Sequence, residues 1–201
     1  RETFRDEDSI RVHPIITKGG EAVSAVPADV RMETFVRGRT VEALMDANAK
    51  VDRALKAGAM AVGAQVKIQT IPGYMPLQQN KAMAEIFRAN AAELVGEENV
   101  GYVDHRGGST DMGDISRLMP VIHPYVGGAT GLGHGATYVV EDYALAVIKG
   151  AKALAYTAID LLGDNASHGN SVAGGQRADM SIPEYLKFMR NLASEETFKS
   201  E

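Results

Sequence analysis

The amino-acid sequence predicts an α/β fold that opens with an incomplete ferredoxin-like α+β unit. Two observations predict it. Residues 1–72 carry hydrophobic periodicities in the order strand, strand, helix, strand, whereas a complete ferredoxin-like unit has the order β-α-β-β-α-β. Beyond Pro72-Gly73, segments with a helical period alternate with glycine-rich loops. The first strand and most of the first helix of the ferredoxin-like unit are therefore absent from the pattern.

The elements of the first segment follow from its alternation of apolar and polar residues. β-Branched and alternating stretches are typical of strands with one buried face. Thr40 is a suitable helix N-cap, and Gly63 is a suitable helix stop. The sequence predicts strands at residues 10–18, 29–37 and 65–71, a short extended piece at 22–26 and a helix at 40–62.

The second segment is predicted to contain two long helices and a shorter final one. Apolar residues at helical spacing between Leu145 and Leu162 form one stripe. Ser181 and Glu184 fit a capping box that starts the last helix. The sequence predicts helices at 78–95, at 141–162 and from 181 onward, strands at 100–103 and 118–126, glycine-rich loops at 106–116 and 127–137, and a mobile linker at 164–179.

Composition narrows the classes of function. With 201 residues and 45% hydrophobic content, the chain can bury a core. A formal net charge of -5 without a basic block argues against nucleic-acid binding. No apolar run approaches the ~20 residues that span a bilayer, and no signal peptide is visible, so no membrane partner and a cytoplasmic location are predicted. Because the chain opens on Arg1 in a polar, helix-like stretch, we expect it to start inside a larger protein.

The five histidines raise the question of a metal site, because without cysteine any metal must be held by His, Asp or Glu. None forms a helical His-x-x-x-His pair, and each can equally be structural. His134 differs because it lies between Gly133 and Gly135, after a predicted strand and before a predicted helix. Glycines leave room to present one imidazole, and functional residues concentrate on such loops. His134 is therefore the preferred ligand candidate.

Two further features are candidates for anion binding. Residues 107–110 (GGST) offer backbone N–H groups and hydroxyls to an anion, although the same residues can form an ordinary turn that caps a short helix. Arg37 ends an alternating strand. Its guanidinium can bind a carboxylate bidentately, or it can be a solvated charge at the edge of a sheet.

The order of several short motifs resembles that of a known enzyme family. Residues 13–20 (HPIITKGG), 22–27 (AVSAVP) and 32–37 (METFVR) are followed by 108–116 (GSTDMGDIS), 120–125 (PVIHPY) and Gly133-His134. This order is similar to that of the two-metal amidohydrolases that include aminoacylase, carboxypeptidase G and p-aminobenzoyl-glutamate hydrolase, and most to the p-aminobenzoyl-glutamate hydrolase-like dipeptidases. The resemblance implies a partial lid (dimerisation) domain at 1–72, the C-terminal part of an α/β metallopeptidase-like catalytic domain at 73–163, and a linker with a C-terminal helix at 164–201.

The resemblance also implies an activity and a set of site residues. The family hydrolyses an amide bond of N-acyl or aminoacyl amino acids or dipeptides, with a water activated by two divalent ions. Zinc is the expected metal, with manganese, cobalt or nickel as alternatives. The last metal ligand falls on His134, and the implied substrate-binding residues are Arg37, Ser24, Gly108, Ser109 and Thr110. Ser24 stands where the family has asparagine, so its contact with substrate is in doubt.

The same resemblance leaves the site incomplete. The general base, the other metal ligands and the lid histidine would lie upstream of Arg1, and His13 does not match that histidine by its context. Since zinc sites need at least three protein ligands, the chain alone is expected to be inactive. A missing N-terminal half or chain and a homodimer through the lid domain are expected partners. The alternative is a non-catalytic oligomerisation or binding module of the same fold; an unrelated α+β binding domain would require the motif order to be a coincidence.

Overall fold

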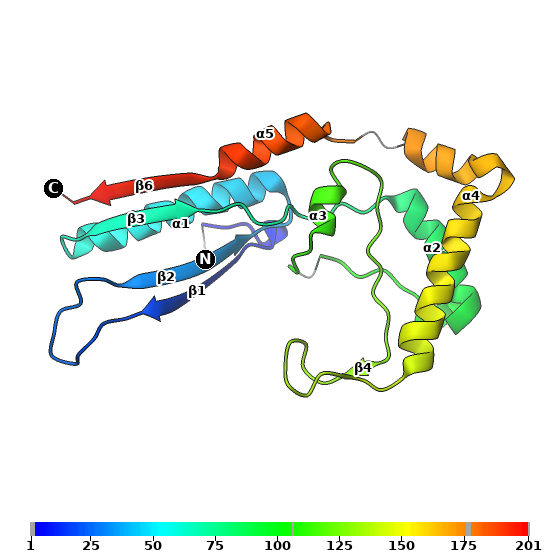
Figure 1. Cartoon of the computed structure of the whole chain (residues 1–201), viewed down its shortest axis with the longest axis horizontal. Coiled ribbons are helices and arrows are strands. Elements are labelled where there is room, and N and C mark those ends of the chain that lie inside the picture. Colours follow the sequence, from blue (N-terminus) through cyan, green and yellow to red (C-terminus); the bar gives the residue numbers. More distant parts are fainter. Residues whose placement is uncertain (1–2, 106, 176–177, 201) are drawn as a thin grey trace. The chain divides into compact units, whose positions relative to one another are not determined.

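The computed structural model describes residues 3–105, 107–175 and 178–200. The chain divides into two compact units, which are drawn with their element labels in Figure 1. Unit 1 combines Arg1–Pro76, His105–Thr110 and Leu186–Glu201, and unit 2 combines Leu77–Asp104 and Asp111–Tyr185. The last residues of the chain therefore belong with the N-terminal unit.

Unit 1 begins with an antiparallel pair of strands. After a short 3-10 turn at Asp6–Asp8, β1 (Arg11–Lys18) pairs with β2 (Arg31–Arg37), so both predicted strands are confirmed. The register opposes Arg11 to Arg37 and shifts between Ile16 and Lys18. The predicted extended piece at 22–26 is wrong, because this part of the connection forms a turn in which the Ala25 N–H donates to the Ala22 carbonyl.

A long helix and a third strand follow. Helix α1 (Val41–Ala61) begins after Thr40, whose hydroxyl accepts a hydrogen bond from the Ala43 N–H at 3.1 Å. Gly63 adopts φ +62°, a conformation that favours glycine and that ends the helix as predicted. Strand β3 (Gln65–Thr70) confirms the last predicted strand of this unit. Ala47 on α1 is completely buried.

The C-terminal strand of unit 1 was not predicted. Strand β6 (Ser194–Lys199) pairs antiparallel with β3, and two ion pairs accompany this pairing: Lys67 with Glu195 at 2.8 Å and Lys56 with Glu196 at 2.6 Å. The sequence SEETFK contains one large apolar residue, so it lacks the alternation that identifies a strand. Strand β6 is formed by its backbone hydrogen bonds to β3, and its own residues do not predict a strand.

Unit 2 is built on two helices that pack together. Helix α2 (Lys81–Val95) begins after Asn80, whose side chain accepts a hydrogen bond from the Met83 N–H at 2.8 Å. It packs against α4 (Gly150–Gly175), which follows a π-helical stretch at Ala144–Lys149. The backbone leaves the helical conformation at residues 163–166 and then becomes helical again. The predicted linker at 164–179 is therefore wrong up to residue 175, while residues 176 and 177 lie outside the described residues.

The remaining predictions for unit 2 are only partly met. Neither 100–103 nor 118–126 forms a strand; in the second stretch Pro120 and Pro124 have no N–H to donate to a sheet. A 3-10 turn at Glu97–Asn99, helix α3 (Met112–Ile115) and the short strands β4 (Ala129–Thr130) and β5 (Val139–Val140) complete the described elements. Of the predicted loop 106–116, Arg106 lies outside the described residues.

Helix α5 (Ile182–Leu192) confirms the predicted capping box. The Ser181 N–H and hydroxyl donate to the Glu184 carboxylate at 2.8 and 2.7 Å, and these bonds hold the pKa of Glu184 below its ordinary value. None of the helices in the described residues combines the length and the apolar character needed to cross a membrane.

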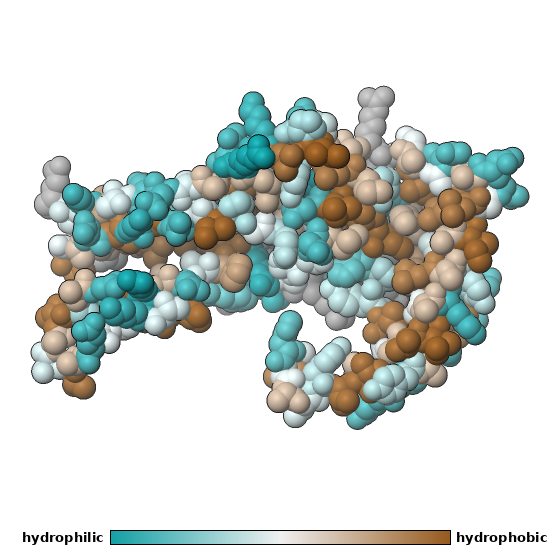
Figure 2. All heavy atoms as spheres, in the orientation of Figure 1, coloured by the Kyte–Doolittle hydropathy of each residue, from teal (hydrophilic) through white to brown (hydrophobic). Residues whose placement is uncertain are grey.

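Along α4, the small residues Gly150, Ala153 and Thr157 are buried. Leu154 and Leu162, two residues of the predicted apolar stripe, are exposed by 55% and 73%, and Figure 2 shows brown surface along this helix. Such a stripe normally packs against a further layer of protein.

One partly buried carboxylate on α1, that of Asp52, leads to a stability prediction. Burial raises the pKa of Asp52 above its ordinary value by more than Lys56 lowers it. The folded state therefore disfavours the charged form, and Asp52→Asn is expected to raise Tm by roughly 1–3 °C at pH 7. The gain should disappear below the ordinary Asp pKa of about 3.9, where both states are protonated.

Thermal unfolding followed by circular dichroism at pH 7 and pH 3 measures this effect. Asp46→Asn is the matched control, because Asp46 lies on the same helix, is exposed and pairs with Lys50. We expect no gain from that variant. A Tm for Asp52→Asn at or below that of the parent protein at pH 7 would contradict the assignment.

Candidate functional site

Arg37 is the sequence-predicted site residue whose surroundings in the structure best support binding. It lies at the end of β2 and is half-buried. Its Nη1 donates a hydrogen bond to the Gly107 carbonyl at 3.3 Å, and its Cζ lies 5.6 Å from the centre of the Phe35 ring. Its Nε is buried and has no hydrogen-bond partner among the described residues. A buried guanidinium N–H without an acceptor is costly, so Arg37 retains an unused donor at this end of the sheet.

A second guanidinium, which sequence analysis missed, lies beside Arg37. The register places Arg11 directly opposite Arg37 in the β1–β2 pair. Directly opposed residues lie on one face of the sheet, with Cβ atoms about 4.5–5.5 Å apart, and like charges in this position repel. In the described part of the chain, no ion pair joins either arginine to a carboxylate. The pair is therefore suited to an anion.

Gly107 completes this site, which we call the arginine pair site (Arg11, Arg37 and Gly107). Its φ is +66°, and a Cβ at this position would lie 2.5 Å from the Arg11 Nε. Glycine is needed here both for the backbone conformation and for the close approach of the arginine. The segment His105–Thr110 of the glycine-rich loop belongs to unit 1 together with both arginines, and its role beside a substrate stays a prediction.

Only some of the other predicted substrate-binding residues lie in the segment that contributes to the arginine pair site. Gly108 and Ser109 follow Gly107 and are exposed, and Thr110 is half-buried in the same segment. Ser24 is exposed in the connection between β1 and β2. It lies beyond the Lys18–Arg31 end of the pair, whereas Arg11 and Arg37 form the opposite end. The structure therefore does not bring Ser24 to the arginine pair site.

His134 lies in unit 2, in the connection between β4 and β5. It is exposed and has φ +63°, which is uncommon for a residue other than glycine. The turn is closed by a hydrogen bond from the Gly135 N–H to the Leu132 carbonyl at 2.8 Å. The loop thus presents an accessible imidazole, and its role as a metal ligand stays a prediction.

No group of three or more His, Cys, Asp or Glu side chains that could hold a metal ion occurs among the described residues. His134 fits a divalent metal in its chemistry, because a neutral imidazole is a common ligand of zinc and related ions. One imidazole is short of the three protein ligands that a zinc site needs. Any metal held by His134 would therefore require ligands from other residues.

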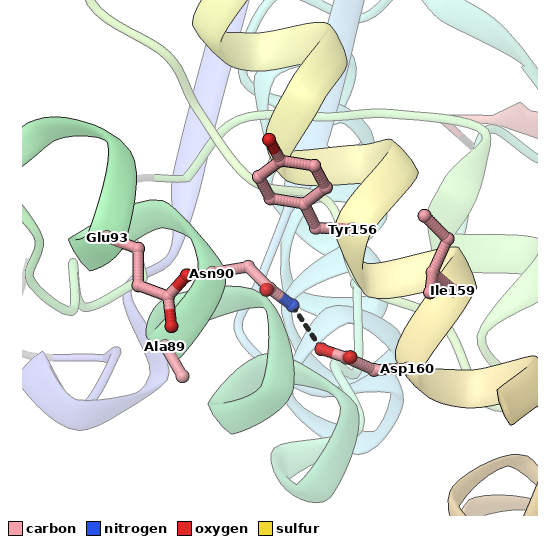
Figure 3. Close-up of a pocket in the computed structure, with 6 residues that line it drawn as sticks. All are labelled: Ala89, Asn90, Glu93, Tyr156, Ile159 and Asp160. Carbon is pink, nitrogen blue, oxygen red and sulfur yellow. Dashed lines mark hydrogen bonds between the residues drawn. The ribbon is translucent and has the colours of Figure 1, made fainter. Parts of the chain in front are cut away.

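The pocket between α2 and α4 is a separate feature of unit 2 (Figure 3). The Asn90 amide donates to Asp160 at 2.6 Å and to the Ile86 carbonyl at 3.1 Å, so both of its N–H groups are used. None of the predicted site residues lines the pocket. The lining residues are Ala89, Asn90, Glu93, Tyr156, Ile159 and Asp160. The hydrogen bond between Asn90 and Asp160 joins α2 to α4. The pocket around it does not resemble a substrate site.

Comparisons with known proteins give two informative matches. The chain is 30% identical over 162 residues to the Xaa-Arg dipeptidase of Mus musculus and 28% identical over 162 residues to that of Homo sapiens. Each match covers 76% of this chain but 37% of the relative, so the chain spans little more than a third of the length of these relatives. No family model and no solved structure matches the chain. The chain is therefore similar to part of two dipeptidases.

Proposed function

We propose that the chain is part of a metal-dependent amidohydrolase that cleaves the amide bond of dipeptides or N-acyl amino acids with a free carboxylate. The observation that carries the proposal is the similarity to two Xaa-Arg dipeptidases over 76% of the chain. The motif order described above supports the same class of enzyme. Dipeptides with a C-terminal arginine are the first substrates to test, because both relatives are Xaa-Arg dipeptidases.

In this proposal the arginine pair site binds the substrate carboxylate. The unpartnered Nε of Arg37 and the opposed guanidinium of Arg11 supply two positive charges and several N–H donors. The Gly107 carbonyl accepts from the Arg37 Nη1 and so fixes the guanidinium plane. Orientation of the carboxylate in turn orients the amide bond, which is a recognised contribution to catalysis.

His134 would supply one metal ligand. A pair of divalent ions, when bound, polarises an amide carbonyl and lowers the pKa of a bound water. The chain's contribution would be a neutral imidazole on an accessible loop. The remaining ligands and the general base would come from a further polypeptide segment. The choice of zinc, the homodimer through the lid domain and the cytoplasmic location stay predictions.

Two observations support the idea that this chain works as a part of a larger enzyme. The matches cover 37% of each relative. The exposed apolar residues Leu154 and Leu162 of α4 offer a surface that a further protein layer would cover. The alternative is a non-catalytic binding module. It is supported by the finding that no group of three or more potential metal ligands occurs among the described residues.

A chimaera distinguishes these alternatives. Residues 10–162 of this chain would replace the matching region of the Mus musculus Xaa-Arg dipeptidase, and hydrolysis of dipeptides with C-terminal arginine would be measured. We expect activity that is lost on removal of metal with EDTA and restored by zinc, and no activity from the chain alone. A folded, metal-loaded chimaera that hydrolyses no dipeptide or N-acyl amino acid would favour the non-catalytic alternative.

A further inference from the structure

One face of the β1–β2 pair carries a line of side chains that begins at the arginine pair site. On β2, Arg37, Phe35 and Glu33 lie on this face, because alternate residues of a strand share one side. The half-buried Thr34 and Val36 lie on the opposite side. The Arg37 Cζ lies 5.6 Å from the centre of the Phe35 ring, which agrees with this placement. The line therefore runs from a guanidinium, past an aromatic ring, to a carboxylate.

The middle of this line is apolar and open to solvent. Phe35 is exposed by 65% and faces His13 across the strand pair. Ile15, which lies opposite Glu33, is exposed by 62%. The face of an aromatic ring attracts a cation through the electrostatic field of the ring. The exposed Phe35 ring thus offers a surface on which the side chain of a bound ligand can lie.

The two ends of the line carry opposite charges that other side chains leave unneutralised. At one end are the two guanidinium groups of the arginine pair site, which form no ion pair with a carboxylate among the described residues. At the other end, the described part of the chain places no ion-pair or hydrogen-bond partner on the Glu33 carboxylate. The next cation on this face, Arg31, is paired with Asp29 at 2.9 Å. A ligand with a negative and a positive group would complement both ends.

The spacing of the two ends fits an amino acid with a long cationic side chain. Glu33 and Arg37 are four positions apart, so their Cα atoms are separated by about 13 Å along the strand. In an extended arginine ligand, six bonds of about 1.5 Å join the carboxylate carbon to the guanidinium carbon and span roughly 7 Å. The difference is close to two hydrogen-bond distances of about 3 Å, one at each end. An arginine ligand lying over Phe35 can therefore reach both ends at once.

We propose that Phe35 and Glu33 bind the positively charged side chain of the substrate residue that carries the free carboxylate. We call these two residues the cation subsite. The inference rests on the proposed function, in which the arginine pair site binds that carboxylate. Charge sets the direction of binding, because the arginine pair repels a ligand cation and Glu33 repels a ligand carboxylate. Phe35 and Glu33 are specificity-determining residues, which select a basic residue over a neutral or acidic one and take no part in bond cleavage.

Binding of small ligands to the chain itself tests the cation subsite without catalysis. The probes are Nα-acetylarginine, Nα-acetylcitrulline, whose side chain has a similar shape but a neutral ureido group, and Nα-acetylglutamate. Dissociation constants are measured by NMR from the shifts of the backbone amide resonances of residues 31–37 in the isotope-labelled chain. We expect acetylarginine to bind about fivefold more tightly than acetylcitrulline, which is the combined effect of an exposed ion pair and an exposed cation–π contact.

Substitutions within the cation subsite show which side chain makes the selection. Glu33→Gln should reduce the preference for acetylarginine to about twofold or less, because only the ring contact remains. Glu33→Lys should reverse the charge preference, so that acetylglutamate binds more tightly than acetylarginine, and a misfolded chain cannot show this gain. Phe35→Leu should weaken the binding of acetylarginine by about threefold. Glu195→Gln is the matched control, because it removes the same charge from an exposed residue of β6 in unit 1 and should keep the parent preference.

The outcomes separate the cation subsite from the proposed hydrolysis. Equal affinities of the parent chain for acetylarginine and acetylcitrulline would overturn the cation subsite, as would an unchanged preference in both Glu33 variants. An equal loss of preference in Glu195→Gln would assign the effect to the charge of the whole unit and would also overturn it. Absence of shifts at residues 31–37 with every probe would refute the arginine pair site and the cation subsite together. An inactive chimaera would contradict only the hydrolysis, because the binding preference is measured without it.

Discussion

His134→Ala is expected to remove the dipeptidase activity of the chimaera. If the imidazole is the last metal ligand, its loss leaves the metal with too few protein ligands. Substitution of residues that only support a ligand already costs about 10–100-fold, so we expect kcat/KM to fall by more than about 100-fold. Metal content per chain, measured by mass spectrometry of the purified protein, should fall in parallel.

His13→Ala is the matched control for this experiment. His13 is an exposed histidine on β1 whose sequence context does not match a family ligand. We expect it to keep its metal and most of its activity. Unchanged metal content in His134→Ala would show that His134 is not a metal ligand. A loss of metal in His13→Ala would show that the control histidine, His13, takes part in metal binding.

Arg37→Ala is expected to raise KM for substrates with a free carboxylate by roughly 10–100-fold, because a hydrogen bond to a charged group contributes about 1.5–3 kcal/mol. The chemical step should change less, since Arg37 is proposed to hold the substrate at a distance from the cleaved bond. Arg37→Lys keeps the charge but lacks Nε, so it should recover only part of the affinity. Steady-state kinetics of the chimaera measure both effects.

Two comparisons make the test of Arg37 specific. A substrate whose carboxylate is converted to an amide should show little difference between the parent protein and Arg37→Ala. Arg11→Ala should raise KM in the same direction by a smaller factor, because Arg11 is more exposed to solvent. An equal rise in KM for the amide substrate would show that Arg37 supports the structure of unit 1 and does not bind the substrate carboxylate.

Local sequence was sufficient for elements whose signal is contained in their own residues. The alternation was correct for β3 and for the end of β2, where Val66, Ile68, Thr34 and Val36 are half-buried; β1 forms the predicted strand, but its residues 13–17 are exposed. Thr40 and the Ser181–Glu184 box marked helix starts, since a side chain that bonds a nearby backbone N–H needs no distant partner. The position of Arg37 at the end of a strand left a solvated charge as an alternative, and the family resemblance gave it a substrate-binding role, which stays a prediction; in the structure Arg37 is half-buried.

Sequence reasoning failed where the deciding partner lies far along the chain. Strand β6 has almost no apolar pattern and exists because β3 offers a backbone edge. The predicted linker at 164–179 is polar and glycine-rich in sequence, yet Val172 is buried and the chain is helical from residue 167 to residue 175. Arg11 carried no local signal at all, because its importance comes from the register that opposes it to Arg37.

The hydrophobic periods, the helix caps and a motif order similar to that of an amidohydrolase family are visible in the amino-acid sequence alone. The periods and caps depend on interactions within a few residues, so they can be identified one after another along the chain. The three-dimensional structure was needed to show that Arg11 and Gly107 join Arg37, that β6 pairs with β3, and that Leu154 and Leu162 of α4 are exposed. Those outcomes depend on which distant segments pair and pack, because register and burial are properties of two segments at once and of neither segment alone.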